Sequence, residues 1–249
     1  RNLVSSVNPS LTPLLGNANT DWQDEIYNNS ATSIINASAN GMLLNKIPAR
    51  ISIGRTFQEG LQLTSRFERN NASFNLNPNF LNNSLKISVN GNASFEKNRF
   101  ASGQAANALT FDPTQPVYDE NSPFGGYFHD GVNNEDDLTA LAPFNPLAEL
   151  LQRRSISNIQ RFYGNVKIDY NFNFLPELSA VLNVGMDKQN ADGTVRVSDK
   201  NPLAQNDGSL VGSYSEYTNS QNNTLLDGYL SYNKEWNNYL TQKLDDAGE

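Results

Sequence analysis

Apolar and polar residues alternate with a period of two along most of the chain from residue 32 onward. The clearest case is the segment 85–96, in which one set of positions is apolar or small and the other is polar. Alternation of this kind predicts a β-strand whose two faces meet different surroundings. Six further segments show the pattern, namely residues 35–40, 49–58, 72–80, 162–173, 178–187 and 226–236. The sequence therefore predicts an all-β protein with about seven antiparallel strands. Helical periodicity is limited to residues 146–153.

The length of these strands separates a soluble sheet from a membrane-spanning one. The best-defined strands run for roughly 9–12 residues, whereas strands of soluble proteins average about 5–6 and a tilted membrane-spanning strand needs about 9–11. Their polar positions are rich in Asn and Ser and poor in charge, which suits a water-filled lumen. Aromatic girdles are expected near the strand ends of a membrane barrel, and the residues found there are Phe57, Phe80, Phe95, Phe172 and Trp236. These features predict a segment of a transmembrane β-barrel.

The connections between the predicted strands alternate between short and long. Short links fall at residues 41–48, 81–84 and 175–177, and long ones fall before residue 32 and at residues 59–70, 98–158 and 188–222. Outer-membrane barrels have short periplasmic turns and longer extracellular loops. We therefore divide the chain into extracellular loops (1–31 and 98–158), strands (32–97 and 159–236) and a polar tail (237–249).

The same alternation predicts where individual side chains point. We expect an apolar set to face lipid, namely Leu85, Ile87, Val89, Phe162, Val166 and Ile168. We expect a polar set to face the lumen, namely Asn90, Asn92, Asn165, Lys167, Asp169 and Asn183. The physical basis is that successive side chains of a strand point to opposite faces of its sheet.

Composition narrows the function classes. The formal net charge of −8 disfavours nucleic acid as a partner, because no basic stripe is present to neutralise phosphates. The absence of cysteine excludes a disulfide scaffold and a cysteine nucleophile. An aromatic content of 10% argues against a disordered chain. The chain starts at Arg1 without an initiator Met or a signal peptide, so we expect it to begin within a longer precursor.

Catalytic and metal-binding signatures are weak, so we expect neither an enzyme nor a cofactor. Asp119 and Glu120 are adjacent and do not form a glycosidase pair, and no G-x-S-x-G elbow or phosphate loop occurs. His129 is the only histidine, and local hydrogen bonding is the favoured interpretation. The acidic segment 133–137 could contribute to a calcium site, but it lacks EF-hand spacing and a solvated loop is favoured.

Aromatic residues gather in the long loop 98–158. Exposed rings stack on sugars and on peptide side chains, so residues of this loop are candidates for contact with a substrate or a partner protein. The candidates are Tyr118, Phe124, Tyr127 and Phe128, together with His129. The alternative that these rings pack their own loop together remains equally open.

Short motifs occur in a fixed order along nearly the whole chain. They are NTDWQDEIY at residues 19–27, QEG at 58–60, SRFER at 65–69, FDPTQPVYDE at 111–120, NPLA at 145–148, GN at 164–165 with DY at 169–170, and LDGYLSYNK at 226–234. In order and spacing they resemble the SusC/RagA-like TonB-linked outer-membrane proteins. The resemblance covers about residues 19 to 236.

This resemblance implies a 22-stranded barrel with an N-terminal plug, located in the bacterial outer membrane. It also implies import of oligosaccharides or peptides that is energised by TonB, with a SusD-like surface lipoprotein as a lid. The chain departs from the pattern because it lacks the plug, the TonB box and the terminal aromatic strand, so we expect it to be about a third of the barrel wall. A soluble, secreted β-sandwich that binds carbohydrate is the main alternative, a passive porin is disfavoured, and the cargo stays open.

Overall fold

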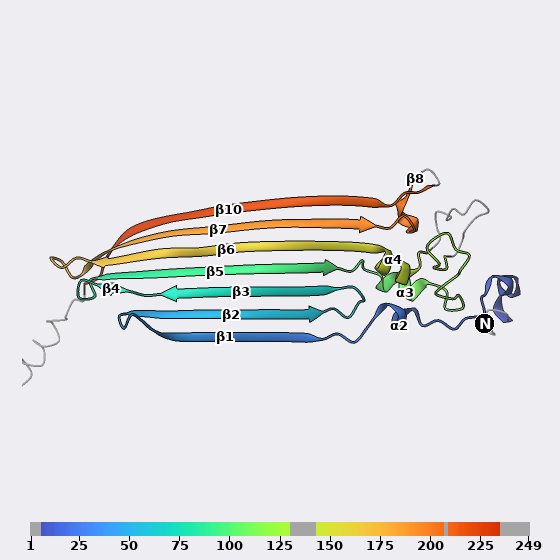
Figure 1. Cartoon of the computed structure of the whole chain (residues 1–249), viewed down its shortest axis with the longest axis horizontal. Coiled ribbons are helices and arrows are strands. Elements are labelled where there is room, and N and C mark those ends of the chain that lie inside the picture. The colour runs from blue at the N-terminus through green and yellow to red at the C-terminus, as the bar shows by residue number, and fades with distance from the viewer. Residues whose placement is uncertain (1–5, 130–142, 207–208, 235–249) are drawn as a thin grey trace, which may run out of the picture.

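The structure, a computed structural model, describes residues 6–129, 143–206 and 209–234. One antiparallel sheet dominates it, in the order β1-β2-β3-β5-β6-β7-β10, and β4 pairs with β5 at one end (Figure 1). The long strands are β1 (Thr32–Leu43), β2 (Ile47–Glu59), β3 (Arg66–Leu76), β5 (Leu85–Phe100), β6 (Arg153–Asn171), β7 (Leu178–Val197) and β10 (Ser213–Tyr232). The short strands are β4 (Asn79–Phe80) and the separate pair β8 (Gln205–Asn206) and β9 (Ser209–Leu210). The predicted all-β sheet of seven long antiparallel strands is thus confirmed.

Every long strand pairs with its neighbour in sequence, which makes the sheet a continuous meander. Strands β1 and β10 form its two edges, so the sheet is open. No second sheet of comparable size faces it among the described residues. The alternative of a two-sheet β-sandwich is therefore wrong for this part of the chain.

One end of the sheet carries short turns. Between β1 and β2 the chain reverses through Leu44 and Asn45, which have φ angles of 52° and 56°, and Lys46 N–H donates to the Leu43 carbonyl at 3.1 Å. Two successive positive φ angles are the geometry of a hairpin turn that matches the twist of its strands. We call this the turn end of the sheet and the opposite end the loop end.

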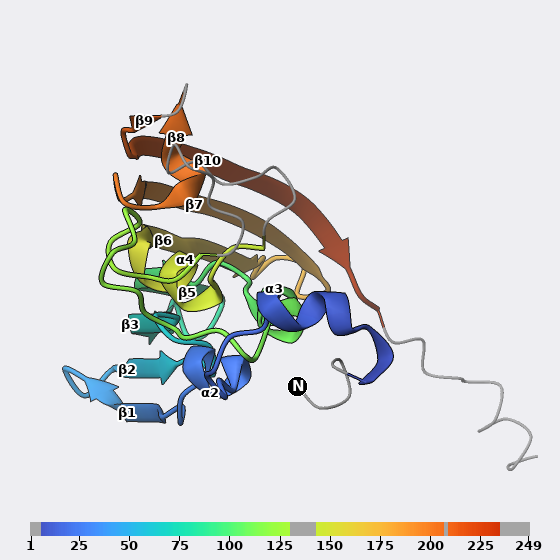
Figure 2. The same cartoon turned by 90° about the vertical axis from the view of Figure 1, so that its right-hand side faces the viewer.

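Short helices and longer connections gather at the loop end, as the view onto that end shows (Figure 2). They are η1 (Pro9–Leu14), α2 (Trp22–Ile26), α3 (Ala105–Thr110), α4 (Pro146–Gln152) and η2 (Pro202–Ala204). The helix expected at residues 146–153 is confirmed as α4. Among the described residues, no helix is long and apolar enough to cross a membrane.

Three strands reach further toward the loop end than the sequence predicted. Residues 188–222 and the end of the segment 98–158 were expected to be loops, but β6 begins at Arg153, β7 runs to Val197 and β10 begins at Ser213. The two connections are therefore residues 101–152 and 198–212. The prediction was wrong because these strand portions carry mostly polar residues on both faces. A strand without an apolar face shows no alternation of apolar and polar residues in the sequence.

Candidate functional site

Strand pairing sorts the side chains of the sheet onto two faces of opposite character. Leu85, Ile87 and Val89 of β5 lie directly across from Tyr170, Ile168 and Val166 of β6, and Ala93 lies across from Phe162. The six residues predicted to meet lipid therefore share one face, which we call the apolar face. The polar face holds the six residues predicted to meet the lumen, with Asn90 across from Asn165 and Lys167 across from Asn183. Contact with lipid or lumen stays a prediction.

The apolar face contains a wide band with very little charge. Four successive rows across the sheet, through Leu85, Ile87, Val89 and Gly91, carry no charged side chain. The next two rows, through Ala93 and Phe95, carry only Lys188 and Arg55 at their ends. From Leu85 to Phe95 a strand rises about 33 Å, which at a tilt of about 40° gives a band about 25 Å tall. This is the height of the apolar band of an outer-membrane barrel.

Aromatic rings border the band at both ends. Phe95 and Phe162 meet edge to face at 5.6 Å on the side of the loop end. Tyr170, Phe172 and Phe174 form a chain of ring contacts at the turn end, with centroid distances of 5.0 and 5.3 Å. Rings at these two levels fit the interfacial girdles of a membrane barrel. Of the aromatic residues expected near strand ends, Trp236 lies outside the described residues.

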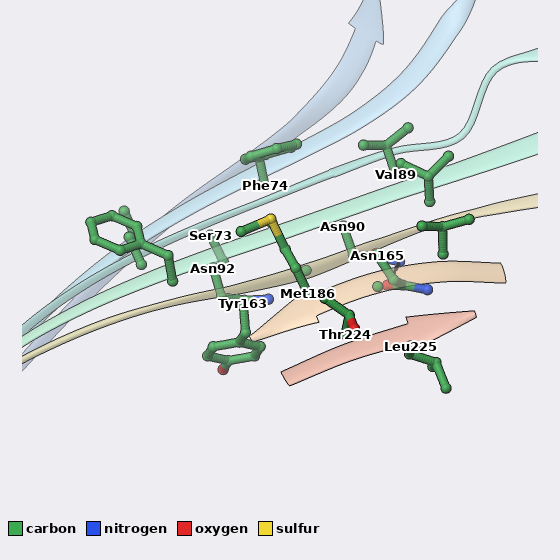
Figure 3. A pocket seen from close by; sticks show the side chains of 18 of the residues that line it. Ser73, Phe74, Val89, Asn90, Asn92, Tyr163, Asn165, Met186, Thr224 and Leu225 are labelled. Atoms are coloured by element: carbon green, nitrogen blue, oxygen red, sulfur yellow. Dashed lines mark hydrogen bonds between the residues drawn. The ribbon is translucent and has the colours of Figure 1, made fainter. Parts of the chain in front are cut away.

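A hollow of about 790 Å³ lies near the centre of the sheet (Figure 3). Gly91 and Gly164 lie across from each other on β5 and β6, and a Cβ atom on Gly91 would lie 2.3 Å from the ring of Phe74. The absence of a side chain at Gly91 thus lets the Phe74 ring lie against β5. Figure 3 also shows the two faces, with Phe74 and Val89 on one side and Tyr163 and Leu225 on the other.

A chain of amide hydrogen bonds crosses the polar face, and we call it the asparagine ladder (Asn77, Asn75, Asn90, Asn165 and Asn183). Asn77 donates to Asn75, and Asn75 donates to Asn90. Asn90 Nδ2 then donates to Asn165 Oδ1 at 3.0 Å, and Asn165 Nδ2 donates to Asn183 Oδ1 at 2.8 Å. The ladder orders polar side chains over strands β3, β5, β6 and β7. It presents amide groups that both donate and accept hydrogen bonds.

An ion pair stands beside the ladder toward the loop end. Arg161 on β6 forms two hydrogen bonds with Asp187 on β7, at 2.9 and 2.7 Å. The guanidinium also lies 4.9 Å from the ring centroid of Tyr163. A two-pronged bond of this kind fixes both side chains more firmly than a single contact. The wall therefore carries ordered charge as well as amides.

The connections at the loop end form a packed unit, which we call the loop platform and define as residues 16–27, 101–129 and 143–152. Trp22 is 2% exposed, its indole N–H donates to the Asp112 carbonyl at 3.0 Å, and its ring meets Phe111 at 4.5 Å. Ile26, Ala108 and Leu150 complete this buried cluster. Thr20 N–H also donates to the Pro113 carbonyl at 2.8 Å, so the motifs at residues 19–27 and 111–120 pack against each other.

Asn145 of the NPLA motif ties the platform together. Its side-chain oxygen accepts from the N–H groups of Leu147 and Ala148, at 3.1 and 3.2 Å, and so caps α4. Its amide nitrogen donates to the carbonyls of Val117 and Phe128, at 2.9 and 3.0 Å. One fully buried asparagine thus uses both amide hydrogens and both lone pairs. The motif is needed for packing rather than for catalysis.

The five loop residues proposed as contacts divide into two groups. Phe124 is 0% exposed and His129 is 5% exposed, while Phe128 packs on the platform core. The platform uses Phe124 and His129 to fill its own interior, as the packing alternative predicts. Phe128 is partly buried, and its contact with a substrate or a partner protein stays a prediction. Tyr118 stays 59% exposed, and its ring lies 5.3 Å from that of Tyr127.

Burial changes the acid–base behaviour of the platform. It lowers the pKa of His129 to about 4, and the Asn145 N–H donates to the ring Nδ1 at 3.4 Å, which agrees with the local hydrogen bonding expected for this histidine. Burial raises the pKa of Glu149, against the opposing effects of a hydrogen bond from Asn201 and the charge of Arg153. No cluster of three or more His, Cys, Asp or Glu that could hold a metal occurs in the described ranges. The acidic segment 133–137 lies outside those ranges.

Comparison with known proteins now adds the family. No family model matches the chain. The TonB-dependent receptor SusC of Bacteroides thetaiotaomicron is 39% identical over 193 residues, which is 72% of this chain and 19% of SusC. The chain is a SusC/RagA-like sequence. With the apolar band, this assigns it to the β-barrel of the TonB-dependent transporters of the outer membrane.

Solved structures agree on the fold. A chain of the RagAB peptide importer in its closed-closed state matches with a TM-score of 0.67 and 18% identity, over 90% of this chain and 24% of that one. The open-open state matches with a TM-score of 0.66 and 17% identity, over 93% of this chain and 26% of that one. The SusC/RagA-like chain thus spans about a fifth to a quarter of the proteins that it matches.

Sequence reasoning missed the ladder and the platform. Its lumen-facing set included Asn90, Asn165 and Asn183 but gave no sign that their amides are joined. The available signal was the spacing of asparagines at corresponding positions of successive strands, which becomes readable only once the register is known. For the platform, the signal was the fixed order of the motifs.

Proposed function

We propose that this chain forms part of the wall of a barrel that imports oligosaccharides or peptides across the outer membrane, energised by TonB and assisted by a SusD-like surface lipoprotein. The observation that carries the proposal is the pairing of an apolar band about 25 Å tall, whose only charged side chains are Lys188 and Arg55 in its two rows toward the loop end, with an ordered polar face on the same strands. The apolar surface is suited to contact with lipid tails, and the polar surface is suited to a water-filled lumen. The relationship to the TonB-dependent receptor SusC supports the dependence on TonB, and the fold shared with the RagAB peptide importer supports peptide import. The oligosaccharide cargo and the SusD-like partner rest on the family resemblance of the motifs.

The asparagine ladder suits the proposed cargo. Oligosaccharides and peptides both carry neutral donors and acceptors, and amides can exchange hydrogen bonds with either at little desolvation cost. The ladder also lies on the face opposite Val89 and Val166, where a lumen must be if those residues meet lipid. We propose that Asn90, Asn92, Asn165, Lys167, Asp169 and Asn183 line this lumen.

The loop platform suits contact with cargo or lid. Its packed core holds the residues around Tyr118 and Tyr127 in one arrangement, with Asp119 N–H donating to the Gly126 carbonyl at 2.9 Å. Burial and the neighbouring Tyr118 both raise the pKa of Tyr127, so its ring stays neutral. Paired neutral rings on a rigid base are suited to stacking against a sugar or an apolar side chain. We propose that Tyr118 and Tyr127 form this contact.

Adjacent cysteine substitutions test the topology. In intact cells, V166C should resist a water-soluble maleimide, whereas N165C one position away should react once the outer membrane admits the reagent. The two variants share a strand and a depth, so only the direction of the side chain differs. Reaction at V166C with protection at N165C would reverse the assignment of the faces.

Uptake in cells tests the energy source and the cargo. Fluorescent oligosaccharides and peptides should enter cells that express the full-length protein, and uptake should cease when TonB is deleted. The pair Tyr118→Ala and Tyr127→Ala should lower uptake of the true cargo severalfold, while Leu109→Ala, an exposed residue of α3, serves as a control. Uptake that persisted without TonB would instead identify a passive pore.

A further inference from the structure

Cations collect on the apolar face at the loop-end border of its apolar band and beyond it. Six basic side chains of this region form no salt bridge within the described residues: Arg55, Lys97, Arg99, Arg154, Lys188 and Arg196. The acidic residues of the same surface are fewer, and Glu68 is already paired with Arg66 at 2.9 Å. The chain as a whole has a formal net charge of −8. This surface therefore carries an excess of positive charge on a chain of negative net charge, which favours the binding of an anion.

Three of these cations form what we call the arginine cluster, defined as Arg99, Arg154 and Arg196. Arg154 on β6 lies directly across from Arg196 on β7, and Arg99 lies close enough to Arg154 for the two charges to repel each other. The Nε atom of Arg99 is buried and has no hydrogen-bond partner in the described part of the chain. None of the three guanidinium groups forms a salt bridge within the described residues, and like charges held together destabilise the protein, an effect that a bound anion relieves.

A hollow adjoins the cluster. It has a volume of about 660 Å³, and Arg154, Arg196 and the acidic Asp199 contribute to its lining. The hydroxyls of Ser198 and Tyr214, which also line it, donate to Asp199 and Glu216. The two guanidinium groups are therefore the donors of this concave space that suit phosphate oxygens.

The position of the cluster indicates the source of the anion. Arg99 lies two rows beyond Phe95, and the pair Arg154–Arg196 lies three rows beyond it. Each row adds about 5 Å of height for a tilted strand, so the cluster stands about 10–15 Å beyond the apolar band. The polar headgroup zone itself begins at the border of that band. A phosphate on a large headgroup would therefore meet these arginines from the side of the membrane.

We propose that the arginine cluster and its hollow bind the phosphorylated headgroup of an outer-leaflet glycolipid. The inference rests on the proposed function, because it requires the apolar band to lie in the membrane. Phosphate accepts two parallel hydrogen bonds from one guanidinium, and basic pockets at the membrane border bind anionic headgroups in this way. Bound lipid would relieve the repulsion within the cluster and hold the protruding strands at a fixed height.

Lipid titration followed by native mass spectrometry tests the site in the full-length protein in detergent. The probe is monophosphoryl lipid A, with its dephosphorylated form as the comparison. The double variant R154Q/R196Q should lose about tenfold in affinity for the phosphorylated lipid, because two charge-assisted contacts disappear. The control variant K86Q/K167Q removes two positive charges from the polar face, and its affinity for the phosphorylated lipid should equal that of the unaltered protein. Equal affinities in all three proteins, or no preference for the phosphorylated lipid, would overturn the proposal.

Two further measurements separate the remaining outcomes. Inorganic phosphate should compete only weakly, and competition as strong as that of the lipid would show a soluble anion site instead. In the R154Q/R196Q background, V89C should stay protected from a water-soluble maleimide, which shows that insertion is intact. Labelling of V89C in the otherwise unaltered protein would overturn the proposed topology and this inference with it. If R154Q/R196Q kept its affinity for the phosphorylated lipid but no longer bound an acidic protein, the cluster would be a site for that protein and the lipid assignment alone would be wrong.

Discussion

A charge placed on the apolar face should destabilise the protein far more than the same charge on the polar face. Val89→Arg and Asn92→Arg form a matched pair, because both residues lie on β5 between the two borders of the band and point to opposite faces. Val89 lies two rows from Leu85 and three rows from Phe95, which places it about 10 Å and about 15 Å from the borders of the band. Arginine cannot extend its whole charged group past either border from that depth.

The expected magnitude follows from this depth. Arginine at the mid-plane of a membrane barrel costs about 2–4 kcal/mol, so Val89→Arg should lower the free energy of unfolding by that amount. Asn92 faces Ser73 and Tyr163 on the polar face, and Asn92→Arg should cost less than about 1 kcal/mol because its charge stays hydrated.

Equilibrium urea unfolding of the full-length protein in phosphatidylcholine vesicles measures both values, with assembly into the outer membrane as a parallel readout. The slope against urea should be the same in both variants, since neither changes the surface exposed on unfolding to a large extent. A cost for Asn92→Arg equal to or above that of Val89→Arg would refute the assignment of the two faces.

Three further predictions concern the loop platform and the ladder. Trp22→Ala should destabilise the platform by about 3–5 kcal/mol through lost burial and the lost bond to the Asp112 carbonyl, and limited proteolysis should then cut residues 101–129 while the sheet stays intact. The platform should also loosen in acid, because the folded pKa of His129 is about 4, below its usual value of 6.5. The stabilisation is complete above pH 6.5 and is lost as the pH falls toward 4; hydrogen exchange should report this, and His129→Gln should flatten the response between those values. Asn165→Ala should leave membrane assembly unchanged and alter cargo uptake, since it breaks the ladder at its centre; unchanged uptake together with poor assembly would contradict a role for the ladder in transport.

The burial of Glu149 has an effect of opposite sign to that of His129. Its folded pKa is raised, so the stability that it contributes is present at low pH and decreases as the pH rises through that raised value. Glu149→Gln should remove this dependence. The pH dependence of the stability of the platform is therefore the sum of two opposing effects. Measuring His129→Gln and Glu149→Gln separately distinguishes them.

The resemblance of the motifs predicted the family, and the alternation of apolar and polar residues predicted the sheet. The structure shows the physical reasons. The TDWQDE motif is a capped helix whose Asp21 accepts hydrogen bonds from the N–H groups of Gln23 and Asp24 at 3.0 and 3.3 Å. Its Trp22 fixes the long loop. Motifs with structural duties of this kind stay in order and at constant spacing even when the loops between them vary, which is why they could be recognised individually as weak signals and together as a strong one.

The sequence by itself determined that the chain forms strands and which side chains of a strand share a face. It could do so because the two-residue period of a strand is a property of the backbone and needs no knowledge of neighbours. The tertiary structure alone decided the register that joins five asparagines into a ladder and sets Arg154 across from Arg196. It also decided which candidate residues of the long loop are exposed, since Phe124 and His129 are buried by contacts with residues far away in the chain. Pairing and burial depend on segments that meet only in space, and no local pattern records them.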